Sequence, residues 1–148
     1  MNISGQQSLS ASPGEVWNSL FDPEVLKACI PGCEEITGSP KDGSVDAVVV
    51  AKVGPVKARI RGTIVLSDAN EPESLTLSAA GKGGAAGFAK GSARIRLAST
   101  DSGTELSYDA EFHVGGKLAQ IGSRLVGGYA RKFTAECFSR LQAQFDSN

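Results

Sequence analysis

The sequence lacks the features that mark a nucleic-acid-binding, membrane-spanning or disulfide-stabilised protein. Its 15 Lys and Arg and 16 Asp and Glu leave a net charge of −1, and no basic run stands out, so no field attracts nucleic acid. No uninterrupted apolar run approaches the ~20 residues of a transmembrane helix. The N-terminus is polar and is expected to carry no signal peptide. Three cysteines do not suggest a disulfide framework, so a reducing cytoplasm is the expected location.

Catalytic side chains are also scarce, because His113 is the only histidine. Alternation along its predicted strand turns His113 toward solvent, away from the face that holds Phe112. A catalytic triad would need this histidine beside a nucleophile and an orienting carboxylate, and nothing in the sequence places either there. Acidic pairs such as Glu34–Glu35 have no partner across an apolar pocket, which general acid–base catalysis requires. The sequence therefore predicts a protein without catalytic residues.

The hydrophobic pattern predicts one α+β domain over residues 1–148, long enough to bury a core. A strand is expected over Asn2–Ser10. Ser12-Pro13 and Asp22-Pro23 each pair a capping residue with a proline, so two short helices should follow. Apolar and polar residues then alternate from 33 to 114, which is typical of an antiparallel sheet, here of about seven strands in all. Spacings of three and four from 118 to 145 predict one long amphipathic helix, laid into the concave side of the sheet.

The sheet face predicted to cover this helix carries unusually small residues. They are Ala47, Ala51, Ala58, Gly62, Ala79, Gly81, Ala93 and Ala110, and the helix adds Gly122, Gly127 and Gly128. Protein interiors are normally close-packed, so either the helix and sheet approach very closely or a cavity remains between them. A cavity of roughly 300–1,000 Å³ is the usual size for a small-molecule site. The pattern leaves both alternatives open.

Cys29 and Cys33, separated by Ile30-Pro31-Gly32, are a candidate redox or metal pair. Thiol oxidoreductases place their cysteines at a helix N-terminus, where the thiol pKa is lowered, whereas Cys29 is expected to end a helix. A metal site needs about four ligands, and Cys137 lies far along the chain. The favoured interpretation is small buried side chains beside a turn.

The glycine-rich bend over 81–91 lacks phosphate-loop spacing and lies between strands. A flexible hairpin bend is favoured, with Phe88 at its centre as an exposed apolar lip of any pocket mouth. The predicted outer face holds Lys57, Arg59, Arg61, Arg94 and Arg96 near Glu105, Asp109 and Glu111. A cross-strand charge lattice is favoured there, and a basic docking patch stays open as the alternative.

Several motifs, in order and nearly end to end, resemble one protein family. They are Ile3-Ser4-Gly5, Val16-Trp17 with Leu20, Asp22-Pro23-Glu24-Val25-Leu26, Cys29-Ile30-Pro31-Gly32-Cys33-Glu34, Lys52-Val53-Gly54-Pro55-Val56, Gly62, Gly103-Thr104 with Tyr108, and the run from Val114 to Gly122 (VGGKLAQIG). With these motifs the chain resembles the G-subunit family of carbon monoxide dehydrogenase, within the START-like helix-grip (SRPBCC) superfamily. The resemblance implies a START/Bet v 1-like fold, in which a curved antiparallel sheet grips a long C-terminal helix.

The resemblance also implies a function. Members have a hydrophobic pocket and are associated with molybdenum-containing hydroxylases of the carbon monoxide dehydrogenase and xanthine oxidase type, in their maturation or membrane recruitment. A lipophilic quinone is one candidate occupant. Longer members carry a linker and an apolar C-terminal anchor, whereas the given sequence ends at Asn148, directly after the predicted long helix. We expect a cytoplasmic protein, with peripheral association at the inner membrane through partners as an alternative.

The predicted function is therefore non-catalytic binding of a small hydrophobic molecule in the service of such a hydroxylase, without a cofactor or metal of its own. The predicted ligand-binding residues are Trp17, Leu26, Ile30, Val49, Ile60, Phe88, Tyr108, Phe112, Leu118, Ile121, Leu125 and Tyr129. Two alternatives remain: a protein-interaction module with a filled core, and a cyclase- or hydrolase-type enzyme that uses the same cavity. An enzyme would need a polar residue of perturbed pKa deep in that cavity.

Overall fold

The computed structural model describes residues 1–146. Its elements in chain order are β1 (Asn2–Leu9), α1 (Pro13–Leu20), α2 (Pro23–Cys29), β2 (Cys33–Thr37), η1 (Pro40–Asp42), β3 (Ser44–Val53), β4 (Val56–Asn70), β5 (Ser74–Lys82), η2 (Gly84–Ala86), β6 (Phe88–Thr100), β7 (Gly103–Gly115), α3 (Lys117–Gln120) and α4 (Ser123–Asp146).

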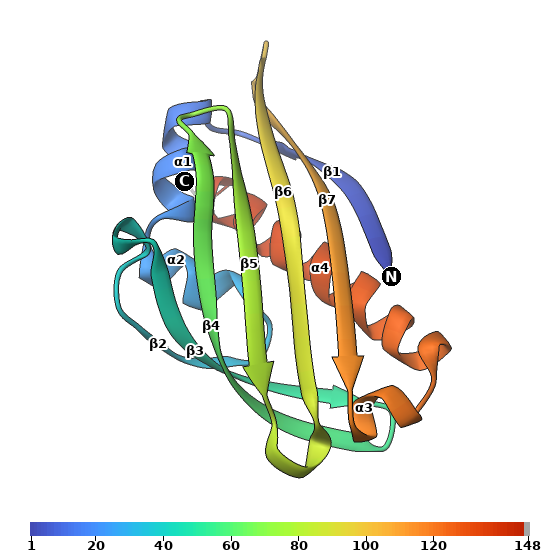
Figure 1. Ribbon diagram of the computed structural model, residues 1–148. Helices are drawn as coiled ribbons and strands as arrows, with labels where there is room; N and C mark the ends of the chain where they lie inside the picture. Colours follow the sequence, from blue (N-terminus) through green and yellow to red (C-terminus); the bar gives the residue numbers. More distant parts are fainter. Residues whose placement is uncertain (147–148) are drawn as a thin grey trace.

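The seven strands form one antiparallel sheet in the order β1-β7-β6-β5-β4-β3-β2. Each strand pairs with its neighbour in sequence except β1, which pairs with β7 and so joins the two ends of the chain. The sheet curves around α4, which crosses its concave face (Figure 1). This confirms the predicted fold class: an α+β arrangement of seven strands, a long C-terminal helix and two short helices after the first strand.

The two short helices begin where their capping residues predict. The hydroxyl of Ser12 accepts a hydrogen bond from the Glu15 backbone N–H at 3.3 Å, and a carboxylate oxygen of Asp22 accepts one from the Glu24 N–H at 3.0 Å. These caps satisfy backbone donors that a helix start leaves free. The helices lie against one end of the sheet, where Val16, Trp17 and Leu20 are buried.

The long C-terminal helix is not continuous, which corrects the sequence prediction. A short helix, α3, ends at Gln120, and Gly122 adopts a left-handed backbone conformation with φ of +96° before α4 begins. Glycine takes this conformation at no steric cost, so the chain can turn there although the apolar spacing continues. None of the helices within residues 1–146 is long and apolar enough to cross a membrane.

Two further sequence expectations need correction. Phe88 begins β6 instead of lying at the centre of a bend, because β5 and β6 pair as far as Lys82 and Phe88. The helix glycines do not form an inner lining: Gly122 and Gly128 are exposed, and Gly127 is covered by the side chain of Met1.

Candidate functional site

The apolar core of the domain is split into two clusters at opposite ends of the sheet. The larger lies under α1 and includes Leu75, Ile95 and Leu106, each fully buried, together with Leu141 of α4. The smaller lies under α3 and is formed by Ala51, Val53, Leu118 and Val126. The two clusters hold the helix against the sheet at both ends.

Between the clusters, apolar residues that face α4 are not fully buried. On the strands these half-buried residues include Val49, Ile60, Ile64, Leu77, Ala93, Ala110 and Phe112, and on the helix they include Ala130, Phe133 and Cys137. Ala79 is exposed, although strand alternation turns its side chain to the same side as the fully buried Leu75. Central positions of a sheet covered by a helix are normally filled to high density. Inner-face side chains in the middle of the sheet are therefore less covered than those at its two ends, and we call the region between them and α4 the central space.

The sheet surface that borders this central space carries glycine and alanine at several positions. Gly62 lies directly opposite Gly81, and Ala79 lies opposite Gly91. At Gly81 the Ile60 side chain occupies the place where a Cβ would stand. Side chains pack closely at Gly81, whereas Ala79 is exposed.

The predicted ligand-binding residues do not all gather in the central space. Four of them are buried, namely Trp17, Leu26, Tyr108 and Leu118. Six are half-buried, namely Ile30, Val49, Ile60, Phe112, Ile121 and Tyr129. Two are exposed, namely Phe88 and Leu125. Trp17 and Tyr108 belong to the larger cluster, while Leu118 lies in the smaller one. Phe88 is 43% exposed and its ring covers Gly115, on the outer face of the sheet.

Two hollows lie on the outer face of the sheet and are distinct from the central space. One of about 320 Å³ is lined by Glu35, Thr37, Asp46, Ala47, Val48, Arg61, Gly62 and Thr63. The other, of about 430 Å³, is lined by Thr63, Val65, Ser78, Ala79, Ala80, Lys90, Gly91, Ser92, Glu111 and His113. None of the twelve predicted residues lines either hollow. Both are open grooves on the outer face, and each is lined by charged as well as apolar residues.

Three residues bring polar groups to the inner face of the sheet or to α4: Cys137 and Tyr129 on the helix, and Tyr108, whose hydroxyl lies over Gly5 of β1. Burial raises the pKa of the Cys137 thiol to about 12, and a nearby Cys29 thiolate would raise it further. Burial also raises the pKa of the Tyr108 and Tyr129 hydroxyls, and a charge on Cys137 would add to both shifts. These groups therefore lie near one another and stay protonated at neutral pH. Cys137 is the residue that sequence reasoning missed as a site residue, although its helical spacing from Phe133 already placed it on the inner face.

This set of groups offers hydrogen-bond donors but little catalytic chemistry. All three cysteines are free thiols. Burial raises the pKa of Cys29 and Cys33, whereas a redox or nucleophilic cysteine needs a lowered pKa. His113 is exposed and lies 3.2 Å from Glu111 on the outer face. Within residues 1–146, no three His, Cys, Asp or Glu side chains are arranged to hold a metal ion.

Solved structures of other proteins share this arrangement of sheet and helices. A conserved protein from Geobacillus kaustophilus has a similar structure, with a TM-score of 0.87 and 31% identity, over 98% of this chain and 95% of that one. A protein from Chromobacterium violaceum is 18% identical with a TM-score of 0.72, over 99% of both chains. Ara h 8.0201 is 14% identical with a TM-score of 0.68, over 100% of this chain and 99% of that one. These likenesses identify a Bet v 1-like helix-grip fold of the SRPBCC type.

A search of curated proteins gives no match. Residues 5–145 match the family described as the G subunit of carbon monoxide dehydrogenase (CoxG). The match spans nearly the whole sequence and agrees with the order of sheet, short helices and long helix in the structure. The chain therefore belongs to the CoxG family of carbon monoxide dehydrogenase proteins.

Proposed function

We propose that the chain binds a small hydrophobic molecule in the central space between the sheet and α4, without catalysing a reaction. One observation carries this proposal: apolar residues facing the helix are half-exposed in the middle of the sheet, while both ends are closed by buried clusters. An apolar surface held open in this way gains about 25 cal/mol for each Å² that a ligand covers, before the costs of ordering.

The polar groups in the space suggest what the ligand carries. Tyr108 and Tyr129 form no hydrogen bond through their hydroxyls to other described residues, and no side-chain oxygen or nitrogen in the described chain is both buried and unpartnered. The Tyr129 hydroxyl, beside the central space, can therefore donate a hydrogen bond to a ligand carbonyl, whereas the Tyr108 hydroxyl lies over Gly5 of the edge strand β1. A lipophilic quinone combines an apolar body with carbonyl oxygens and is the ligand class that we propose.

Family membership supports the second part of the proposal, an accessory role. The family is described by its link to carbon monoxide dehydrogenase. We infer that the ligand-loaded protein serves a molybdenum-containing hydroxylase of the carbon monoxide dehydrogenase or xanthine oxidase type, in its maturation or recruitment. Co-purification of a tagged chain with such a hydroxylase tests this part separately from ligand binding.

The ligand-binding part is tested by filling the central space. Ala79→Phe places a ring in that space, and the exposure of Ala79 leaves room for it without unfolding. Ala80→Phe is the matched control, because the neighbouring side chain is also exposed but lies on the outer face. Calorimetric titration with a short-chain benzoquinone should show binding to the parent and to Ala80→Phe, and loss of at least tenfold in affinity for Ala79→Phe.

Two results would contradict ligand binding. One is a purified parent protein that carries no lipid in native mass spectrometry and shows no heat on titration. The other is equal affinity in the Ala79→Phe and Ala80→Phe variants. If the hydroxylase still co-purified in either case, the filled-core interaction module would replace the binding protein as the function.

A further inference from the structure

Eight of the fifteen Lys and Arg side chains of this protein lie at one end of the sheet. Three segments meet there: residues 50–61 around the β3–β4 turn, residues 80–91 around the β5–β6 turn, and residues 112–125 through α3 into α4 (Figure 1). Leu125 of α4 contacts Gly54, and Gly87 contacts Gly115 and Gly116, so the segments touch. They contain no Asp or Glu, but eight exposed cations, which we call the basic end: Lys52, Lys57, Arg59, Arg61, Lys82, Lys90, Lys117 and Arg124.

The strand register forces cations of the basic end to face one another. Lys52 of β3 lies directly opposite Lys57 of β4, and Arg61 of β4 lies opposite Lys82 of β5. Like charges in directly opposed positions destabilise a sheet. Among the described residues of the basic end, only Arg59 has a carboxylate partner, Glu34. The opposed pairs therefore carry repulsion that an external anion would reduce, although Glu35 and Asp46 line the hollow beside Arg61, and Glu111 lines the one beside Lys90.

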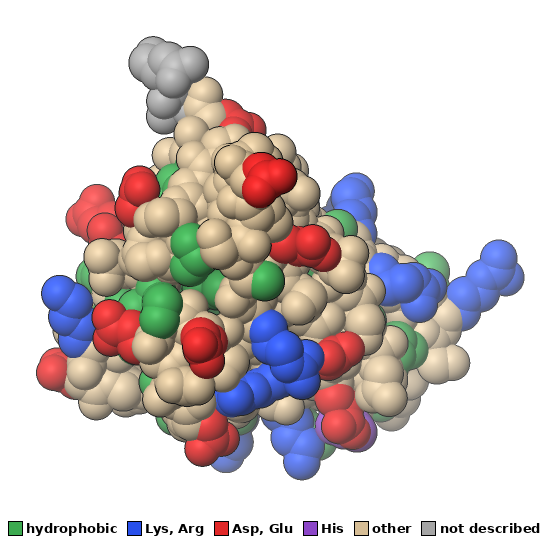
Figure 2. All heavy atoms as spheres, turned by 90° about the horizontal axis from the view of Figure 1, so that it is seen from above, with side chains coloured by type: hydrophobic (Ala, Val, Ile, Leu, Met, Phe, Trp, Pro, Cys, Tyr) green, Lys and Arg blue, Asp and Glu red, His purple; other side chains and the backbone are tan. Residues whose placement is uncertain are grey.

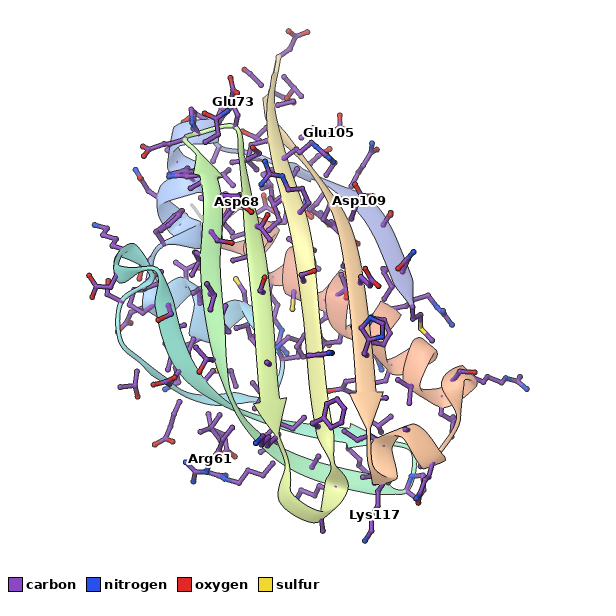
Figure 3. The ribbon with its side chains drawn as sticks, in the orientation of Figure 1. Arg61, Asp68, Glu73, Glu105, Asp109 and Lys117 are labelled. Atoms are coloured by element: carbon purple, nitrogen blue, oxygen red, sulfur yellow. The ribbon has the colours of Figure 1, made fainter. Side chains whose placement is uncertain are left out.

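The other half of the outer face shows the opposite arrangement. Arg94 lies opposite Asp109 in the register, and Arg96 forms an ion pair with Asp109 at 3.0 Å. Figure 3 places Asp68, Glu73, Glu105 and Asp109 in the half away from Arg61 and Lys117. Figure 2, which looks onto that far end, shows Asp and Glu side chains interspersed with Lys and Arg. The predicted charge lattice is thus present in one half only, and the alternative of a basic patch fits the other half.

Exposed apolar side chains accompany these cations. Phe88, 43% exposed, lies between Lys82, its partner across the strands, and Lys90, two residues along β6. Leu125 is 50% exposed and follows Arg124 at the start of α4. Two of the four large hydrophobic residues that are exposed in the described chain are therefore located at the basic end, each next to a cation.

We propose that the basic end docks directly on a lipid bilayer that contains anionic headgroups, with Phe88 and Leu125 entering the interface. A bilayer presents negative charge above an apolar layer, and cations with long stems can reach its headgroups while neighbouring apolar side chains enter below. An acidic protein would complement the charges but not two separate apolar side chains on different segments. This inference goes beyond ligand binding and does not depend on an occupied central space.

Flotation of ligand-free protein with vesicles tests the proposal. We expect binding at low ionic strength to phosphatidylcholine vesicles that contain about one-third phosphatidylglycerol, weak binding to pure phosphatidylcholine, and release by salt. Each cation near the surface should contribute about fivefold in affinity, so the double variant K52Q/K57Q should bind about thirtyfold more weakly. K27Q/K41Q is the matched control, because it removes two exposed cations outside the basic end and should bind within about twofold of the parent.

A second variant separates a bilayer from an acidic partner. Phe88→Ala should weaken vesicle binding severalfold while binding to soluble polyglutamate stays unchanged. Absence of binding to the anionic vesicles at low salt would overturn the proposal. So would equal losses in K52Q/K57Q and K27Q/K41Q, which would indicate net charge alone. Binding to polyglutamate as tight as to vesicles, with no effect of Phe88→Ala, would assign the basic end to an acidic protein instead.

Discussion

The ring of Tyr108 on β7 stacks on the ring of Phe138 on α4, with centroids 4.3 Å apart and planes 16° from parallel. This stack joins sheet and helix at the border of the larger cluster. Phe138→Ala should therefore lower the free energy of unfolding by about 2–4 kcal/mol, through lost burial and the space left behind. Urea unfolding measures the change.

Phe133→Ala is the control for the aromatic stack. Phe133 lies just over one helical turn away on α4 and its ring is 6.0 Å from that of Tyr129, beside the central space. Its truncation should cost less stability than that of Phe138 and should weaken ligand binding more. Equal losses of stability in the two variants would mean that the middle of the domain is as tightly packed as its end.

Substitution by alanine should have opposite effects on stability at Gly5 and at Gly14. A Cβ at Gly5 would collide with the hydroxyl end of Tyr108, whereas one at Gly14, in the first turn of α1, meets nothing within 4 Å. Gly5→Ala should destabilise the fold by about 1–3 kcal/mol, since Tyr108 must leave its place on Phe138. Gly14→Ala should stabilise it by about 0.5–1 kcal/mol through helix propensity. Thermal unfolding of both variants gives the comparison, and a stabilised Gly5→Ala would refute the contact.

Asp109 makes stability depend on pH. A hydrogen bond from Ser4 at 2.7 Å, followed by one from Arg96, holds the pKa of the Asp109 carboxyl below its usual range. Because the folded state binds this proton less readily than the unfolded state, the contribution is present above the ordinary pKa near 4 and is lost as pH falls through the lowered value. Asp109→Asn should lower Tm at pH 7, and the difference from the parent should shrink below pH 4. Glu105→Gln serves as the control, and an equal difference at both pH values would contradict the assignment.

The three cysteines should react slowly with a thiol reagent at pH 8. Burial raises the pKa of each, so little thiolate is present, and the fraction should grow as pH rises. Cys33 should be labelled before Cys29 and Cys137. Burial raises its pKa, but a backbone hydrogen bond at Glu35 and the charge of Lys27 act against that rise, whereas burial raises the pKa of Cys137 to about 12 and Cys29 is buried. The C29A/C33A variant should keep ligand affinity, measured by the same titration. Its loss in a folded variant would restore a redox role for this pair.

Much of the fold follows from local patterns in the sequence. The caps at Ser12 and Asp22, the alternation along the strands and the helical spacing at the end each specify their own element. The break at Gly122 was missed because apolar residues continue at helical spacing through Ile121 and Leu125. Only the backbone conformation at that glycine distinguishes a turn from one more helical residue.

The candidate site could be predicted only as one of two alternatives. The small residues at Gly62 and Ala79 are visible in the sequence, but the separation between helix and sheet depends on contacts distant in the chain, such as Tyr108 with Phe138 and Gly54 with Leu125. The basic end likewise does not show in the net charge of −1, which averages over the whole chain. It depends on the strand register, which sets Lys52 opposite Lys57.

The larger cluster also has a consequence for how the protein is made. It contains Leu9 from the first strand, Leu106 from the last strand and Leu141 near the end of α4. A ribosome that has synthesised β1 must therefore release the chain as far as β7 before the strand that pairs with β1 exists. Contacts so distant in sequence slow folding. The β1 segment therefore stays unpaired through most of synthesis. It has no charged side chain, so only its polar side chains keep it in solution during that time.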